Sequence, residues 1–158
     1  MIWRSKREPR DPDRVRSTPS APAAWIEAAP IDPAAWAALP KTEPQRNPFL
    51  LSMARGQSCT MRTMHCNGDR ATTVACHSNW AEHGKAGARK ADDQWHVHGC
   101  SACHAWLDQG DAPAEDKRAI FDAGMVRMRS IWHDIVSGMQ HATPREKAAA
   151  QWALDRIK

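Results

Sequence analysis

Cys100-Ser101-Ala102-Cys103-His104 lies near the end of a stretch, residues 59–108, that contains all five cysteines of the 158-residue chain. Two cysteines separated by two residues at the start of a helix can place both thiolates on one metal ion. A second cysteine pair lies upstream and can complete a tetrahedral site. The sequence therefore predicts a structural zinc ion with four thiolate ligands, Cys59, Cys66, Cys100 and Cys103.

The upstream cysteines are spaced more widely than the downstream pair, which leaves other ligands open. His65 or Cys76 is an alternative ligand at one position, and Cys76 is otherwise expected to be a buried thiol on a strand. The Cys-x-x-Cys-His order is also the attachment pattern of haem c, with His104 and either Met125 or Met128 as axial ligands. We favour zinc, because covalent haem attachment usually follows export and the first residues do not resemble a secretory signal.

The composition indicates a small domain that benefits from a metal. Hydrophobic residues make up 42% of the chain, but tyrosine is absent, there are only 2 phenylalanines, and the 8 tryptophans supply most of the large apolar side chains. A core with so little bulk gains stability from a structural metal. The net charge of +4 mildly favours nucleic acid as a partner. No apolar run is long enough to span a membrane, so we expect a cytoplasmic protein whose clustered cysteines bind metal.

The chain divides into three expected regions. Residues 1–47 are rich in proline and alanine, which disfavours both helices and strands, and they predict a flexible, disordered arm. Trp25 and Trp36 each follow an Ala-Ala pair and make this arm a candidate docking segment for a protein partner. Residues 48–112 are expected to form the zinc-bound core, and residues 113–158 a helical extension.

Local patterns predict the elements of the core. Residues 48–58 predict a short helix that ends at a glycine, and residues 101–109 predict a second helix with the same kind of ending. Two short runs with strand character, residues 71–77 and 95–98, are separated by a basic, glycine-containing loop at residues 78–94.

The last third of the chain predicts two helices. Thr143, Pro144 and Glu146 form a capping box with proline at the first helical position, which starts the final helix. Before it, apolar residues recur at steps of three and four, as expected for the buried face of one helix. These residues are Phe121, Met125, Met128, Trp132, Ile135 and Met139.

Four short segments together resemble a known family. They are Cys66-Asn67-Gly68, residues 73–77, residues 90–93, and residues 100–104 with the following Leu107-Asp108. The pattern resembles a family of small phage and prophage proteins regarded as candidate nucleases, which is in turn similar to zinc-containing HNH, or ββα-metal, endonucleases. The resemblance covers roughly residues 47–135. It implies an α+β fold with a small zinc-stapled ββα-metal core of the HNH or treble-clef kind.

The resemblance also implies a function and roles for individual residues. The implied function is metal-dependent hydrolysis of phosphodiester bonds in DNA, in the cytoplasm of a bacterial host. A phage or host protein is the further partner expected, bound through the N-terminal arm. His77, at the end of a strand, takes the place of the general base, and His104 takes the place of a ligand for a catalytic magnesium or manganese ion. Asp93 is the expected residue for the position between the two histidines, where it orients the general base or contributes to binding the ion. Asp108 follows His104 by one helical turn and is a second ligand or a partner of the histidine.

Two further points bear on this expectation. Lys85, Arg89 and Lys90 lie in the basic loop and are candidate contacts to DNA phosphates. Many HNH enzymes have an acidic residue or a histidine directly before the first histidine, whereas this chain has Cys76. The alternative is a non-catalytic zinc module that binds nucleic acid or a phage protein and makes no catalytic use of His77.

Overall fold

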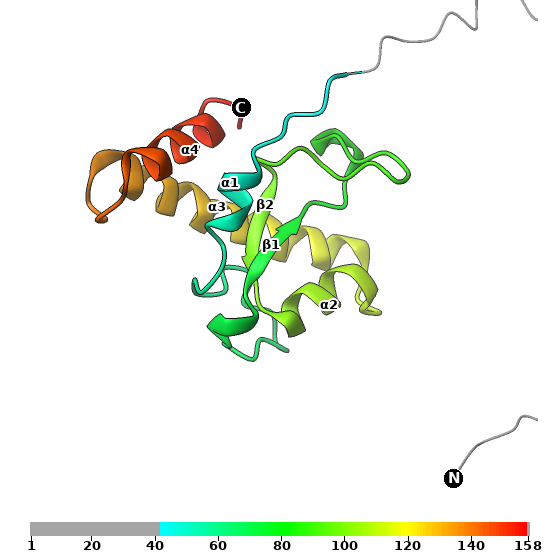
Figure 1. The fold of residues 1–158 in the computed structure, drawn as a ribbon. Coiled ribbons are helices and arrows are strands. Elements are labelled where there is room, and N and C mark those ends of the chain that lie inside the picture. Colours follow the sequence, from blue (N-terminus) through cyan, green and yellow to red (C-terminus); the bar gives the residue numbers. More distant parts are fainter. Residues whose placement is uncertain (1–41, 158) are drawn as a thin grey trace, which may run out of the picture. The chain divides into compact units, whose positions relative to one another are not determined.

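Residues 42–157 are described by a computed structural model (Figure 1). The expected arm with Trp25 and Trp36 lies, up to residue 41, outside the described residues. Within them the protein combines helices with one small sheet, as the α+β expectation requires. The elements in order are α1 (Pro48–Ser52), η2 (Arg70–Thr72), β1 (Val74–His77), η3 (Ala81–His83), β2 (His96–Gly99), α2 (Ser101–Gln109), α3 (Ala114–Ser137) and α4 (Pro144–Leu154).

The sheet consists of β1 and β2, which pair antiparallel. Val74 lies opposite Gly99 and His77 lies opposite His96, so the last residue of β1 faces the first residue of β2. A two-stranded hairpin alone is marginal in water and needs cover on its faces. Figure 1 shows α3 passing behind the strands, with α2 packed beside them.

The long helix α3 supplies most of the core. Phe121, Met128 and Trp132 on its inner face are almost completely buried. Gly124 lies on the same face, where a Cβ atom would come 3.0 Å from Cγ1 of Val97 on β2. The absence of a side chain at this glycine lets the helix backbone approach the sheet closely. None of the helices within residues 42–157 is long and apolar enough to cross a membrane.

The expected apolar stripe is confirmed except at its end. Met139 was expected on the buried face, but its side chain is 79% exposed. The reason is that α3 ends at Ser137 and Gly138 takes a left-handed conformation, with φ of 82°. The following helix, α4, begins with the expected capping box between Thr143 and Glu146.

Two elements are shorter than the sequence predicted. The helix expected over residues 48–58 is only α1, which Asn47 caps by accepting a hydrogen bond from the backbone N–H of Leu50. The strand expected from residue 71 starts at Val74. Asp69 accepts a hydrogen bond from the Ala71 N–H and stabilises the η2 turn, so residues 70–72 are in this turn and not in the strand.

Residues 42–47 run along the segment that precedes β2. The backbone N–H of Gln45 donates to Oδ1 of Asp92 at 3.1 Å, and that of Asn47 donates to Oδ2 of Asp93 at 2.6 Å. The Arg46 guanidinium pairs with Oδ1 of Asp93 at 3.1 Å. These contacts fix two acidic residues more than forty positions away in the sequence.

Two histidines of β2 are buried. His96 has no exposed surface, and its Nδ1 lies 2.6 Å from the carbonyl oxygen of Asp93. Within the described residues, Nε2 of His96 and Nδ1 of His98 have no hydrogen-bond partner. Burial lowers the pKa of His96 to about 3 and that of His98 to about 4, so both rings are neutral near pH 7.

The stability of the protein is expected to fall in acid because of His96. The unfolded chain binds a proton there below about pH 6.5, whereas the folded protein resists protonation until the pH approaches 3. The contribution of neutral His96 to the free energy of unfolding is therefore present above about pH 6.5 and decreases as the pH falls below it. For His96 alone, we expect the free energy of unfolding to fall by about 1.2 kcal/mol between pH 7 and pH 5.5.

Denaturant unfolding of the wild type and of His96→Phe at both pH values measures this effect. Phenylalanine occupies similar space but cannot titrate. The stability difference between the two proteins should therefore change by about the same 1.2 kcal/mol on acidification, whatever acid does at the cysteines. An unchanged difference would mean that His96 is not the source of the acid sensitivity.

Candidate functional site

The structure brings the four expected cysteines together. Cys59 and Cys66 lie at the two ends of the knuckle loop (residues 59–66), and Cys100 and Cys103 lie at the start of α2. Their sulfur atoms are all within 4.8 Å of one another, and the sulfurs of Cys66 and Cys100 are 3.8 Å apart. Tetrahedral zinc with four thiolates places its sulfurs about 3.8 Å apart. This four-cysteine cluster can therefore hold a metal ion such as zinc.

The surroundings of the cluster favour ionised sulfur at Cys100. Burial favours the neutral thiol of Cys100, but the backbone amides of Cys103 and Asn67 favour the thiolate and lower its pKa to about 6. The hydroxyl of Thr63 lies 3.3 Å from the sulfur of Cys103. Polar groups next to the sulfurs are the partners that metal-bound thiolates require.

The alternative ligands lie elsewhere. His65 is exposed, and neither it nor Cys76 belongs to the cluster. The Cys76 side chain is completely buried, its sulfur lies 3.8 Å from the carbonyl oxygen of Gly99, and burial raises its pKa. Since Cys100 and Cys103 share one small volume with the upstream cysteines, the donor set fits a tetrahedral metal better than a haem attachment site.

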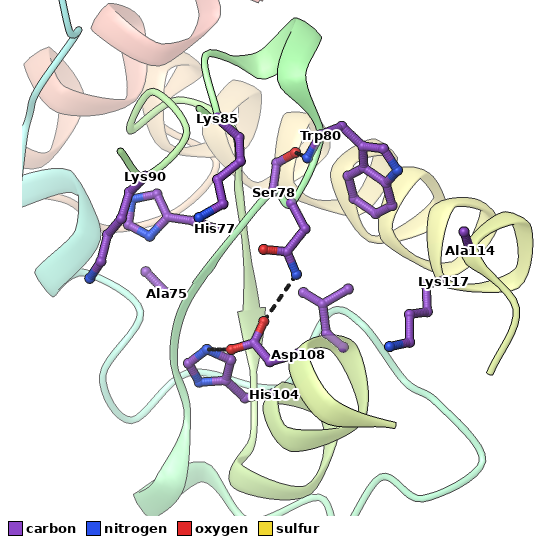
Figure 2. A pocket seen from close by; sticks show the side chains of 12 residues that line it. Ala75, His77, Ser78, Trp80, Lys85, Lys90, His104, Asp108, Ala114 and Lys117 are labelled. Atoms are coloured by element: carbon purple, nitrogen blue, oxygen red, sulfur yellow. Dashed lines mark hydrogen bonds and ion pairs between the residues drawn. The ribbon is translucent and has the colours of Figure 1, made fainter. Parts of the chain in front are cut away.

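A polar pocket of about 810 Å³ is lined by residues of β1, α2 and α3 and of the loop after β1 (Figure 2). It opens between the end of β1, the loop that follows β1, helix α2 and the first turn of α3. We refer to it as the polar pocket. Its lining residues are Ala75, His77, Ser78, Asn79, Trp80, Lys85, Lys90, His104, Leu107, Asp108, Ala114 and Lys117.

His77 enters the polar pocket from the end of β1. Its Nε2 lies 3.1 Å from Oδ1 of Asp93, whose side chain is only 4% exposed. Burial lowers the pKa of His77, an effect that Asp93 opposes and that Lys90 and Arg46 increase. His77 is therefore a neutral imidazole near pH 7, with one nitrogen oriented by a fixed carboxylate.

His104 and Asp108 enter the same pocket from α2. Their spacing of four residues places them one above the other, with Nε2 of the histidine 3.2 Å from Oδ2 of the aspartate. The side chains are 38% and 44% exposed. Asn79, from the loop after β1, donates to Oδ1 of Asp108 at 3.1 Å. A nitrogen and a carboxylate oxygen are thus presented side by side to the pocket.

The basic residues of the loop between the strands separate into those that line the polar pocket and one that does not. Lys85 and Lys90 line the polar pocket, as does Lys117 from α3. Arg89 is not among the lining residues, because its guanidinium donates to the carbonyl oxygen of Thr42 at 2.7 Å and to Asp92 at 3.2 Å. Sequence reasoning missed Lys117, since no local signal places the first turn of α3 beside residues nearly forty positions earlier.

Comparisons with known proteins identify related chains. The model of a family described as "Putative nuclease YbcO" matches residues 50–137. A solved structure of a putative bacteriophage protein from Escherichia coli str. K-12 substr. MG1655 is 28% identical, with a TM-score of 0.42. The match covers 56% of this chain and 98% of that chain. A search of curated proteins found no match.

Removal of one cluster cysteine should abolish both zinc binding and the stable fold. We expect the wild type to contain about one zinc per chain and Cys59→Ser to contain little, because three thiolates bind zinc far more weakly than four. The variant should also lose a cooperative thermal transition. Metal analysis and thermal melting of the purified proteins measure both effects.

Cys76→Ser is the matched control. It changes a buried cysteine outside the cluster and should keep the zinc, although it loses some stability by burying a hydroxyl group. Equal zinc content in the wild type and Cys59→Ser would refute the four-thiolate site.

Proposed function

The chain belongs to the YbcO family, and from this membership we propose that it is a metal-dependent endonuclease that hydrolyses phosphodiester bonds in DNA. The observation that carries the proposal is the content of one pocket. A neutral, oriented histidine, a histidine–carboxylate pair and lysines all line the polar pocket. Phosphodiester hydrolysis needs a base to activate water, ligands for an ion, and cations to bind phosphate.

We further propose that the site is of the HNH, or ββα-metal, type. The order of elements around the pocket supports this assignment: β1 ends at His77, β2 follows, and α2 then carries His104. The four-cysteine cluster lies where α2 begins, so a structural zinc would fix the helix that carries the second histidine.

His77 is the proposed general base. When Nε2–H donates to Asp93, the free lone pair is on Nδ1, which makes no hydrogen bond within residues 42–157. Because burial lowers the pKa of His77, this lone pair is available at neutral pH to accept a proton from water. Asp93 is a positioning residue in this scheme: its oxygens are already bonded to Arg46, Asn47 and His77.

His104 and Asp108 are the proposed ligands of a catalytic magnesium or manganese ion. One carboxylate and one imidazole, both partly exposed, leave room for the phosphate oxygens and water molecules that such ions also bind. When bound, the ion would stabilise the negative charge that develops on the phosphate and the leaving oxygen. Asn79 orients the carboxylate through its hydrogen bond to Oδ1.

Lys85 and Lys90 are the proposed phosphate contacts. Within the described residues neither lysine forms an ion pair, so their charges remain available to a polyanion. We do not assign Arg89 this role, since its contacts to Thr42 and Asp92 hold the loop in place. Binding through such lysines should weaken as the salt concentration rises.

The decisive variant for catalysis is His77→Ala. We expect zinc-loaded wild type to relax or linearise supercoiled plasmid when magnesium or manganese is added, and His77→Ala to be at least about 100-fold slower because the base is missing. The variant should keep its zinc and its thermal transition, since His77 is not part of the cluster.

His133→Ala is the matched control, because this histidine is exposed on α3 outside the polar pocket. It should cleave like the wild type. Equal cleavage by His77→Ala would refute the mechanism. A wild type that binds zinc and DNA but never cleaves would indicate the non-catalytic zinc module instead.

The ion-binding role is tested separately with Asp108→Asn. The amide keeps the shape of the side chain but removes its charge, so the magnesium or manganese concentration for half-maximal cleavage should rise about tenfold. Asp111→Asn, an exposed carboxylate outside the polar pocket, should leave that concentration unchanged. An unchanged requirement in Asp108→Asn would remove this residue from the proposed ligands.

A further inference from the structure

The polar pocket extends beyond the residues that the proposed chemistry uses. Hydrolysis accounts for His77, His104 and Asp108, yet Trp80 and Lys117 also line the pocket. In Figure 2, Trp80 and Lys117 lie on the side of the pocket away from His77, while Lys85 and Lys90 lie toward His77. A volume of about 810 Å³ exceeds what a single phosphate group needs and is typical of a site for a whole small ligand.

Trp80 is a half-buried indole in a fixed position. Its backbone N–H donates to Oγ of Ser78 at 3.1 Å, and Oγ of Ser78 lies 2.6 Å from Nδ1 of His83. The indole packs on Phe121 with ring centroids 5.1 Å apart, and the Arg118 guanidinium lies over one face of the ring, 4.9 Å from its centre. The ring is thus supported by α3 and still lines the pocket.

The charges around Trp80 distinguish the two neighbouring cations at the start of α3, Lys117 and Arg118. Arg118 is already paired with Glu82 and Asp122, so its charge is balanced locally. Lys117, the preceding residue, forms no ion pair within residues 42–157 and lines the pocket. An aromatic surface next to an unbalanced lysine is the combination that binds a nucleobase and its phosphate.

We propose that Trp80 and Lys117 form a binding site for one unpaired nucleotide, whose base stacks on the indole and whose phosphate contacts the lysine. Lys85 and Lys90, at the other end of the pocket, bind the neighbouring phosphate near His77. The inference rests on the proposed nuclease function and adds the substrate class: a strand that is single at the point of cleavage.

The geometry of stacking is the physical reason why the site would select a single strand. Inside a duplex both faces of a base are covered by its neighbours, so an indole cannot stack on it unless the base is unpaired or flipped out. A fixed tryptophan in the same pocket as the proposed general base, His77, therefore favours single-stranded segments, flaps or loops over a continuous duplex.

Binding can be measured without cleavage. The probe is a fluorescein-labelled 12-nucleotide thymidine strand, compared with a blunt duplex of the same length, on zinc-loaded His77→Ala protein without added magnesium or manganese. We expect the single strand to bind at least about tenfold more tightly than the duplex, and a further Trp80→Leu change to weaken single-strand binding about tenfold. The further change Lys117→Ala should weaken it about threefold and reduce the salt dependence by about 0.7 in slope.

Matched controls come from α4. Trp152 is also half-buried beneath an arginine, with the Arg156 guanidinium 4.3 Å from its ring centre, but it lies outside the polar pocket. Trp152→Leu and Lys147→Ala should therefore leave binding unchanged. Because Trp80 also packs on Phe121, each variant is checked for zinc content and thermal unfolding. If Trp80→Leu does not fold, Lys117→Ala and Trp80→Phe, which keeps an aromatic face, decide the question.

The outcomes separate this inference from the proposed function. Equal binding of single strand and duplex, or folded Trp80 and Lys117 variants that bind like their parent, overturns the nucleotide site even if the wild type cleaves plasmid. Single-strand binding that depends on Trp80 supports the site even if the wild type cleaves nothing, in which case only the nuclease function fails.

Discussion

Four sulfurs within 4.8 Å of one another are the constraint on which the rest of the structure depends. The sheet has only two strands of four residues each, too little to be stable alone. An ion in the four-cysteine cluster would join the knuckle loop to the start of α2, directly after β2. The knuckle loop in turn hydrogen-bonds to β2, through the backbone N–H of Thr60 and the carbonyl oxygen of His98. With an ion bound, this connection would fix the direction of α2 and with it the position of His104 and Asp108.

The alternating direction of the side chains along β1 explains why a cysteine can precede the proposed general base. Successive side chains of a strand point to opposite faces, so Cys76 and His77 lie in different environments. Cys76 fills the interior, where a Cβ on Gly99 would come 2.4 Å from its sulfur, while His77 lines the polar pocket. The position before the histidine therefore serves packing here. The proposed ion depends on α2 for its ligands, and an acidic residue in place of Cys76 would bury an unpaired charge in the core.

Local patterns predicted the parts of the structure that depend on neighbouring residues. The Cys-x-x-Cys spacing, the helix over residues 101–109 and the capping box at Thr143 all follow from contacts within a few positions. The same reasoning could not find Lys117, nor could it show that Arg89 is bound by Thr42, because both depend on contacts between distant segments. Met139 was misplaced for a local reason: the periodicity continued past Gly138, where the backbone leaves the helix.

His77 is subject to two opposing requirements, and the segment before α1 reconciles them. Burial lowers the pKa of His77 and keeps the imidazole neutral, but a neutral ring needs a partner to fix which nitrogen carries the proton. Asp93 provides that partner and, as an anion, raises the pKa again. Arg46 pairs with the same carboxylate oxygen and itself lowers the pKa of His77, so it limits the effect of the charge without removing the orientation. Residues 42–47 therefore act on the proposed base electrostatically, although their own sequence carries no catalytic motif.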